Sequence, residues 1–563
     1  MNTALLPGDL PVSHGRQLLA KFSLALAAGS FSVAFLVFII GLALLALGGP
    51  IRDSVFLAGC AGASLVTVWV ARLEGLRSST ILALLMVFVA LVWATLILAS
   101  AFFDISWDGQ AYHQEAIIQL TKGWNPFYQS LGDDVAHAIW IRHYPKAAWI
   151  FASSTYLFTG SIESGKAFQL LLVSAAFLLA FSAALRINLL SLWSALIVGG
   201  VAMANPVVIY QSLSYYVDGA MSSLLTAMVA LSVILLLKPN RFLAVFLAAV
   251  GILAINLKFT GVPYVLIGGA GLAIIAAKSR KFDVTRLAIW SVIGGVILGV
   301  GFGYDPYIKN TVTHMHPFFP LRGENAIDIM AHTMPRPLMQ MGRLEKLGFS
   351  LFHESSNDLN PTIRLKIPMS VASTEEINTF QVPDVRLGAW GPLFGGILIL
   401  ALGAIGALLA LSKQRQAVSL MSATVLVLMA SVLANPEAWW ARYTPQLWLV
   451  PLIVSVALLS HRAKPIRIAG FIVGLLMLVN SSLVAKAYYP FNYRTSGELH
   501  AQMSKLARGP HPIAVSFGPF PAVRVRLERA NVPYTMVSSP MGLICTAPSY
   551  LHGTMEQTIY CGY

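Results

Sequence analysis

The stretch S-T-I-L-A-L-L-M-V-F-V-A-L-V-W-A-T-L-I-L-A-S-A-F-F-D-I-S-W-D-G-Q-A-Y-H at 79–113 decides the fold class of this chain. Its first part, 79–102, is uncharged and apolar, and as a helix it is long enough to cross about 30 Å of hydrocarbon. The motif W-D-G-Q-A-Y-H follows and places Asp108 just past the end of that span. An acid there is either an ordinary solvated loop residue or a group retained for chemistry. The motif alone leaves both interpretations open.

The same apolar pattern recurs from Phe22 to Ala487, in runs of roughly 17–25 residues. The 563-residue chain is 57% hydrophobic and only 11% charged, far from the composition of soluble domains. Alternating segments typical of membrane barrels are not seen, so we predict an all-α polytopic membrane protein. The net charge of +14 does not indicate nucleic acid, because the basic residues cluster in short connections between spans. That clustering is the positive-inside pattern.

The first span follows Arg16 and Lys21, and its apolar run is too long for a signal-peptide core, so it is predicted to be retained. We predict about thirteen spans, near 22–48, 54–71, 79–102, 166–185, 190–207, 217–237, 241–256, 260–277, 287–308, 389–411, 417–434, 444–460 and 468–487. With a cytoplasmic N-terminus, the basic connections all fall inside; they hold Arg72, Arg77, Arg186, Lys238, Arg241, Lys278 to Arg286, Lys413, Arg415 and Arg462 to Arg467. The marginal segment 144–160 would invert this pattern if it crossed, so we predict that it is a re-entrant or interfacial helix.

Three long regions fall on the outer side: 103–165, 309–388 and the tail 488–563. We predict a transmembrane domain over 1–487 and a small outer domain over 488–563. The first region begins with amphipathic helical spacing, which suits a helix along the membrane surface. The tail contains P-I-A-V-S-F, A-V-R-V-R-L-E-R-A and Y-T-M-V-S-S, which indicate strand, helix and strand. Its Cys545 and Cys561 can form a disulfide if the tail is extracytoplasmic, and two free thiols are the alternative.

Several ionisable side chains near the outer ends of spans form a candidate site, namely Asp108, Lys146, Asp218, Lys258, His314, His316 and Arg442. Each also has an ordinary structural interpretation. The acids could be solvated helix ends, the basic residues could extend toward lipid headgroups, and Lys258 could be a helix-end cation beside Gly261 and Pro263. The pair H-M-H at 314–316 does not by itself indicate a metal, and Trp439 and Trp440 also fit an aromatic belt.

The combination of acids and cations indicates more than any single member. A carboxylate can take a proton from an attacking hydroxyl or amine while fixed cations stabilise a departing phosphate. A lipid-phosphate donor would explain why such chemistry is in a membrane. No nucleotide-binding glycine loop is found, since G-F-G-Y at 301–304 lacks the strand-to-helix context.

With these motifs in order over roughly 100–450, the chain resembles the GT-C glycosyltransferases, in particular the branch of aminoarabinose-to-lipid-A transferases and protein O-mannosyltransferases. The matching elements are W-D-G-Q-A-Y-H (107–113), H-Y-P-K-A-A-W (143–149), S-Y-Y-V-D-G (214–219), the Lys258 to Gly261 break, Y-I-K-N-T-V-T-H-M-H-P-F-F-P (307–320) and A-R-Y-T-P (441–445). The chain departs from the family pattern in having more than one span before the long outer region that begins at 103, and in having no second acid directly after Asp108.

The resemblance implies transfer of a sugar from a polyprenyl-phosphate donor to a lipid, glycan or protein acceptor, with inversion. It implies Asp108 as general base and Asp218 as a residue that orients the acceptor or shares that role. Lys146, Lys258 and Arg442 would bind the donor phosphate, Lys146 foremost, and substrate contacts are expected from Tyr112, His113, His314, His316 and Tyr443. No cofactor is expected, a divalent metal is not indicated, and no nucleic acid is expected as a partner.

The expected location is a bacterial inner membrane, with the site facing the periplasm. Two alternatives from other classes stay open: a transporter or flippase of a lipid-linked sugar, and an O-antigen polymerase or ligase. A transporter would need access from both faces, and usually internal symmetry, whereas the polar candidates here fall on one face. A polymerase or ligase would be expected to carry Arg-rich outer loops in place of paired acids.

Overall fold

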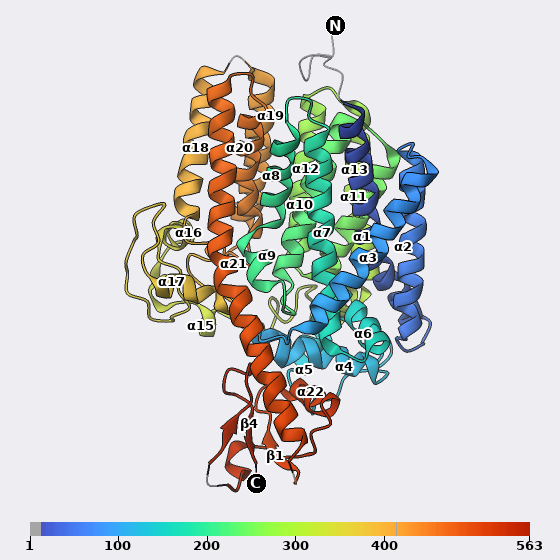
Figure 1. Ribbon diagram of the computed structural model, residues 1–563, viewed down its shortest axis with the longest axis vertical. Helices are drawn as coiled ribbons and strands as arrows, with labels where there is room; N and C mark the ends of the chain where they lie inside the picture. The colour runs from blue at the N-terminus through green and yellow to red at the C-terminus, as the bar shows by residue number, and fades with distance from the viewer. Residues whose placement is uncertain (1–12, 413, 510, 546, 563) are drawn as a thin grey trace.

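The computed structural model describes residues 13–412, 414–509, 511–545 and 547–562, and it is a bundle of long helices with a small sheet at one end (Figure 1). Within these residues, nine helices are long and apolar enough to cross a membrane. They are α1 (His14–Ala46), α2 (Asp53–Leu73), α3 (Ser78–Ala101), α7 (Ala167–Leu185, with the turn Ile162–Lys166 before it), α10 (Asp218–Leu237), α12 (Gly261–Lys278), α13 (Phe282–Phe302), α19 (Arg415–Ala434) and α21 (Lys464–Ala507).

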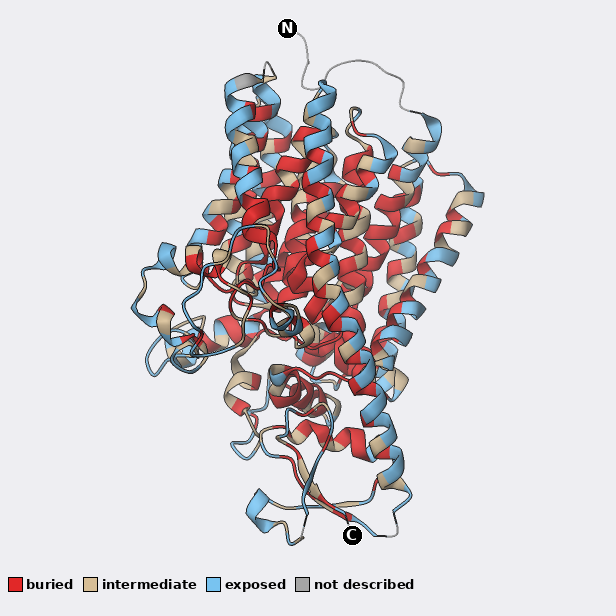
Figure 2. Ribbon diagram, turned by 60° about the vertical axis from the view of Figure 1, so that its left-hand side comes forward, coloured by how far each residue is buried: buried red, intermediate tan, exposed pale blue. Residues whose placement is uncertain are grey.

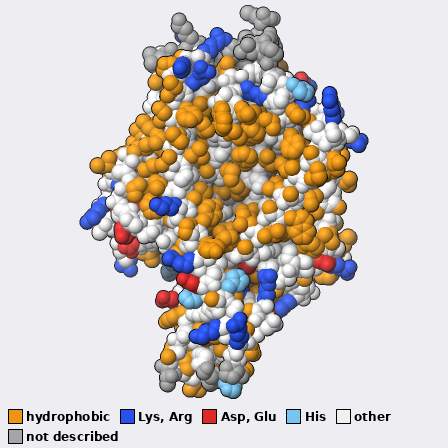
Figure 3. All heavy atoms as spheres, viewed as in Figure 1, with side chains coloured by type: hydrophobic (Ala, Val, Ile, Leu, Met, Phe, Trp, Pro, Cys, Tyr) orange, Lys and Arg blue, Asp and Glu red, His pale blue; other side chains and the backbone are white. Residues whose placement is uncertain are grey.

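Four shorter apolar helices occupy the remaining predicted positions, namely α8 (Leu192–Met203), α11 (Arg241–Leu257), α18 (Phe394–Leu411) and α20 (Leu449–Leu459). Every one of the predicted spans therefore corresponds to a helix, and the prediction of a multi-pass helical membrane protein is confirmed. Buried residues fill the centre of the bundle (Figure 2). A broad apolar band covers the middle of the face seen in Figure 3, with most of the Lys and Arg side chains toward the ends. That distribution is the one that hydrocarbon requires of a helical protein.

The two ends of the bundle differ. The start of α1 lies at one end and the C-terminal sheet at the other (Figure 1), and successive long helices alternate in direction between them. The connections α2–α3, α7–α8, α10–α11, α12–α13, α18–α19 and α20–α21 consequently all turn at the α1 end, and these hold the predicted inner basic residues. Lys413 lies outside the described residues. We call the opposite end, which carries the sheet, the outer end.

Short helices cover the outer end: α4 (Gln114–Thr121), α5 (Ala138–His143), α6 (Ala147–Thr159), α9 (Pro206–Gln211), α14 (Lys309–His314), α15 (Met330–Thr333), α16 (Arg343–Phe352) and α17 (Thr374–Asn378). The segment 144–160 forms α6, which lies with the other short helices at the outer end of the bundle (Figure 1). Helix α4 differs from the predicted surface helix, because six of its eight residues are buried. It is enclosed between α6 and the turn Pro521–Val523 of the tail.

The tail forms a four-stranded sheet in the order β2-β1-β4-β3, built from β1 (Ile513–Ser516), β2 (Tyr534–Met536), β3 (Ser549–Tyr550) and β4 (Ile559–Cys561). Strands β1 and β2 are parallel and α22 (Arg524–Arg529) connects them, as the predicted strand, helix and strand require. Cys545 and Cys561 are joined by a disulfide, the pairing favoured for an extracytoplasmic tail.

The predicted domain boundary at 487/488 falls inside a helix. Helix α21 continues through Pro490 to Ala507, so the tail is attached by a continuous rod and not by a linker. Leu499 and Met503 of that rod share an apolar core with Val515 and Phe520 of the tail and with Phe103 of the first outer loop. The tail is therefore packed against the segment that carries Asp108.

Candidate active site

A cavity of about 1370 Å³ opens at the outer end of the bundle, where segments far apart in the sequence meet. It is larger than the usual small-ligand pocket of about 300–1,000 Å³. Most of the predicted site residues lie on its wall, and Tyr443 adjoins Arg442 in the α19–α20 connection. These residues are Asp108, Tyr112, His113, Asp218, Lys258, Arg442 and Tyr443.

Arg442 is the centre of the charged group. Its Nε donates to Asp218 Oδ2 at 2.8 Å and its Nη2 to Asp108 Oδ2 at 3.2 Å, while Nη1 lies 3.4 Å from Asp384 Oδ1. The guanidinium also lies over the ring of Tyr216, 4.1 Å from its centroid. Of the guanidinium's five N–H groups these contacts use three, so two remain for a ligand.

Lys258 and Asp218 form a second ion pair beside it. Asp218 is fully buried at the start of α10, where a carboxylate also suits the positive end of the helix dipole. Its two oxygens accept from Lys258 on one side and from Arg442 and Gln211 on the other. The Lys258 ammonium lies 4.2 Å from the ring centroid of Tyr443 and has donors left for a ligand.

Close packing explains the Lys-x-x-Gly break. Lys258 follows the last residue of α11, and the Gly261 N–H donates to the Lys258 carbonyl at 2.8 Å. A Cβ at Gly261 would lie 2.2 Å from the Ala254 carbonyl oxygen, so a side chain cannot fit where the chain returns into α12. This turn holds Lys258 at the cavity wall.

The backbone around Asp108 is shaped by a second acid, Asp104. The Ser106 N–H donates to Asp104 Oδ1 at 2.8 Å, and the Ser106 hydroxyl accepts from the Gly109 N–H at 3.1 Å. A Cβ at Gly109 would lie 1.7 Å from Asp104 Oδ2, so only glycine fits there. Asp108 therefore begins a tight π-helical turn, Gly109–His113, that turns Tyr112 back to donate to Asp108 Oδ2 at 3.2 Å.

Burial sets the protonation of this loop. Burial raises the pKa of Asp108 above its ordinary value, and the neighbouring Arg442 opposes the rise. Burial lowers the pKa of His113 to about 3, so its imidazole is neutral at pH 7 and accepts at Nδ1 from Trp149 Nε1 at 2.7 Å. Burial also lowers the pKa of Lys258, and Asp218 opposes that shift. A raised carboxylate pKa makes a stronger base.

Lys146 does not line the cavity. Its side chain is 4% exposed, and its ammonium lies 3.1 Å from Asp305 Oδ2 and donates to the carbonyls of Arg142 and Tyr144 at 3.1 and 2.9 Å. Burial raises the pKa of Asp305, and Lys146 opposes the rise. All three donors of Lys146 are thus used within the protein, so this geometry does not support the expectation that it is the foremost phosphate ligand.

The two histidines of H-M-H also lie away from the cavity wall. The His314 ring stacks on Phe319 at 3.8 Å, and His316 Nδ1 accepts from the Phe318 N–H at 3.1 Å. Asn310 of the same stretch joins the second outer loop to the first, since its side chain contacts both His143 and the Phe319 carbonyl. The described part of the chain contains no cluster of three or more His, Cys, Asp or Glu side chains able to hold a metal.

Asp384 is a member of the site that the sequence did not indicate. It is held near Arg442 because Trp440 Nε1 donates to the Val385 carbonyl at 2.8 Å and Gln211 Nε2 to the Pro383 carbonyl at 3.4 Å. Asp384 lies in V-P-D-V-R of the second outer loop, shortly before the predicted span at 389–411, and no motif marks it. Only long-range contacts bring it to the cavity.

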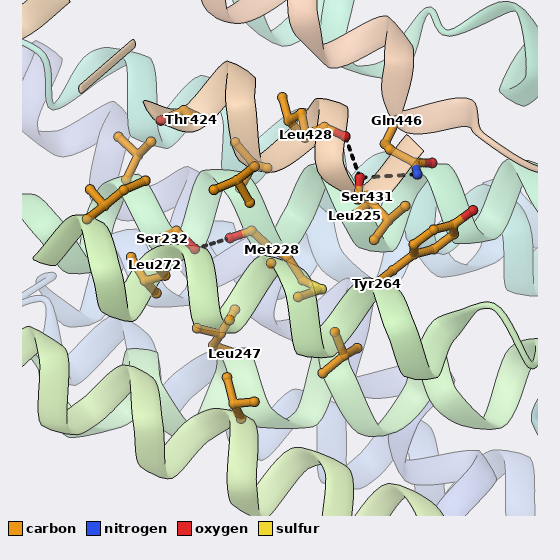
Figure 4. A pocket seen from close by; sticks show the side chains of 18 of the residues that line it. Leu225, Met228, Ser232, Leu247, Tyr264, Leu272, Thr424, Leu428, Ser431 and Gln446 are labelled. Atoms are coloured by element: carbon orange, nitrogen blue, oxygen red, sulfur yellow. Dashed lines mark hydrogen bonds between the residues drawn. The ribbon is translucent and has the colours of Figure 1, made fainter. Parts of the chain in front are cut away.

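A second, apolar pocket lies between α10, α12 and α19, with about 100 Å³ of space among residues such as Leu225, Met228, Gly268 and Val427. Tyr264 and Gln446 lie at the same end of it (Figure 4). The Tyr264 hydroxyl donates to the carbonyl of Tyr443, a residue of the charged cavity. The apolar pocket thus ends next to the charged cavity.

The fold and this cavity define a multi-pass membrane protein with a charged site at one end. In comparisons with known proteins, no family model and no curated protein matches the chain. Among solved structures it is similar to ArnT from Cupriavidus metallidurans bound to undecaprenyl phosphate, at 11% identity and a TM-score of 0.43, over 81% of this chain and 86% of that chain. ArnT is a GT-C glycosyltransferase, the class that the sequence motifs resemble.

Proposed function

We propose that this protein is a membrane glycosyltransferase that moves a sugar from a polyprenyl-phosphate donor to an acceptor at the outer face. The observation that carries the proposal is the group of Asp108, Asp218, Lys258 and Arg442 on the wall of one large cavity beside the membrane. A proton acceptor and cations with free donors are the two requirements of displacement at a phosphate-activated carbon.

In the proposed step, the acceptor's hydroxyl or amine attacks the anomeric carbon while the bond from that carbon to the phosphate oxygen breaks. Asp108 takes the acceptor's proton, and the bonding electrons leave with the phosphate. Lys258 and Arg442 stabilise the phosphate through their unused N–H groups. Attack from the side opposite the leaving group inverts the carbon. Asp218 holds both cations in place, so its proposed role is positioning.

The lipid character of the donor is supported by the two adjoining cavities. The charged cavity would take the sugar and the phosphate, and the apolar pocket along α10, α12 and α19 would take part of the prenyl chain. Several residues that line the apolar pocket, among them Val229, Val233 and Val427, are only partly buried, which supports entry of the prenyl chain from the bilayer. A chain could enter from the bilayer without passing through water.

The proposed location is a bacterial inner membrane with the outer end facing the periplasm. The basic connections at the α1 end support this orientation by the positive-inside rule. The disulfide at the opposite end supports an oxidising compartment. The acceptor class, whether lipid, glycan or protein, is left to the assay.

The test is sugar transfer by purified protein in liposomes, supplied with radiolabelled polyprenyl-phosphate sugars and membrane extract as acceptor source. Wild type is compared with Asp108→Asn and with Asp134→Asn, a matched change at an exposed aspartate of the same outer loop. We expect transfer by wild type and Asp134→Asn, and a loss of about 10²–10⁴-fold in Asp108→Asn. Label that crosses the bilayer unchanged, equally in all three proteins, would contradict the proposal and identify a transporter.

A further inference from the structure

Arg526 of the tail reaches into the centre of the first outer loop. The side chain is 1% exposed. Its Nη2 donates to the Asp104 carbonyl at 2.7 Å and lies 2.9 Å from Glu163 Oε1, its Nε donates to the same Glu163 oxygen at 3.1 Å, and its Nη1 donates to Gln110 Oε1 at 3.4 Å. The guanidinium thus binds the loop on both sides of Asp108, four residues before it and two after.

Two cations, Arg526 and Lys166, lie beside two acids, Glu163 and Asp104, so the charges balance when both acids are ionised. Glu163 is buried between Arg526 and Lys166, with Lys166 Nζ at 2.8 Å, and it also accepts from the Asp104 N–H at 3.0 Å. The Lys166 ammonium further contacts the Phe102 carbonyl at the end of α3. The network therefore ties together the end of α3, the Asp108 loop, the start of α7 and helix α22.

Other contacts also join the tail to the same loop. Arg524 makes a two-pronged ion pair with Glu115 of α4 at 2.6 and 2.9 Å. The Gln110 amide donates to the Gly553 carbonyl at 3.0 Å, and Trp107 packs edge-on against Phe520 at 4.9 Å. Trp107, just before Asp108, and Gln110, two residues after it, are therefore both in contact with the tail.

We infer that the C-terminal domain is a positioning element of the active site, in which Arg526 fixes the backbone of the 104–115 loop and so the place of Asp108. Its kinetic consequence rests on the proposed function, while the ordering of the loop does not. Arginine suits this position because one planar fork reaches a carboxylate, a carbonyl and an amide at once, which a lysine cannot do. Arg526 touches neither cavity nor substrate, so it acts through Asp108.

The experiment compares full-length wild type, Arg526→Gln, Arg526→Lys and the control Arg508→Gln, which changes an exposed arginine just after α21. Amide hydrogen exchange is followed over 104–115 and, for reference, over α10 and α11. Transfer kinetics are measured on the same samples. Arg526→Lys keeps a cation beside Glu163, so it provides a folded variant should Arg526→Gln fail to fold.

In both Arg526 variants we expect faster exchange in 104–115 with α10 and α11 unchanged, and a fall in kcat of about 10²-fold for a displacement of about 1 Å. KM for the donor stays within about twofold, because Lys258 and Arg442 are not displaced. Unchanged exchange in 104–115 overturns the inference, as does faster exchange with normal kcat. Faster exchange throughout the bundle with KM and kcat both altered indicates a merely structural role and also overturns it. Absence of transfer by wild type refutes the proposed function, and exchange then still decides whether Arg526 orders the loop.

Discussion

Replacing Arg442 by glutamine removes the cation that three carboxylates share. Asp218 would keep Lys258 and Gln211, and Asp108 would keep Tyr112, but Asp384 has no other ion-pair partner among the described residues. Removing one partner of a buried ion pair costs about 3–5 kcal/mol. Because two of the three acids keep a partner and Asp108 and Asp384 are each 24% exposed, we expect the lower end, about 3 kcal/mol.

The effect on catalysis follows from the same geometry. Loss of one fixed donor beside a developing negative charge lowers kcat by about 10²–10³-fold, which corresponds to about 2.7–4 kcal/mol of transition-state stabilisation. Arg442→Lys keeps a charge but cannot contact Asp108, Asp218 and Asp384 together. We therefore expect the kcat of Arg442→Lys to lie between those of wild type and Arg442→Gln.

The pH profile gives the sharpest test of Arg442→Gln. Burial raises the pKa of Asp108 and Arg442 opposes that rise, so removal of Arg442 raises the pKa further. Since the proposed base acts as the ionised carboxylate, activity is lost as pH falls through its pKa. The acid limb of kcat/KM must then move to higher pH in Arg442→Gln. Liposome transfer assays across pH, with the exposed Arg364→Gln as control, measure it. An acid limb that stays in place or moves to lower pH would refute Asp108 as the base.

Three further variants test separate parts of the structure. Lys146→Met leaves the buried Asp305 without its cation and should lower the free energy of unfolding by about 3–5 kcal/mol, and adding Asp305→Asn should recover most of that loss. A raised donor KM with an unchanged melting midpoint would instead indicate that Lys146 binds the phosphate. Gly109→Ala forces a Cβ against Asp104 and should lower kcat without changing KM for the donor, because only the Asp108 turn is displaced. A normal kcat would contradict this explanation of the turn. Gly268→Leu fills the apolar pocket and should raise KM for long-chain donors about tenfold, because about ten carbon contacts of about 0.1–0.2 kcal/mol each are lost. KM for a short-chain analogue should not change. Equal effects on both donors would exclude the pocket as a prenyl site.

The helices were predictable because hydrocarbon thickness fixes how long an apolar run must be, and each run here is bounded by polar residues. The end of α21 was not predictable in the same way. The sequence becomes polar near 488 and contains Pro490, which suggests a break, yet the helix continues to Ala507. What stabilises its polar half is packing of Leu499 and Met503 against the tail, a contact that no local pattern reveals.

The candidate site was predictable as a set of elements but not as a set of contacts. Lys146 and Lys258 belong to different motifs, but each is a lysine at the outer end of an apolar segment, and neither motif shows which lysine keeps donors for a ligand. The difference lies in their partners: Asp305 uses Lys146 inside the protein, whereas Asp218 holds Lys258 at a cavity wall. A charge near hydrocarbon must be paired. A paired cation can bind a ligand only where the ion pair leaves some of its N–H donors facing the cavity. At this outer end, therefore, the placement of the acids decides which cations can bind substrate.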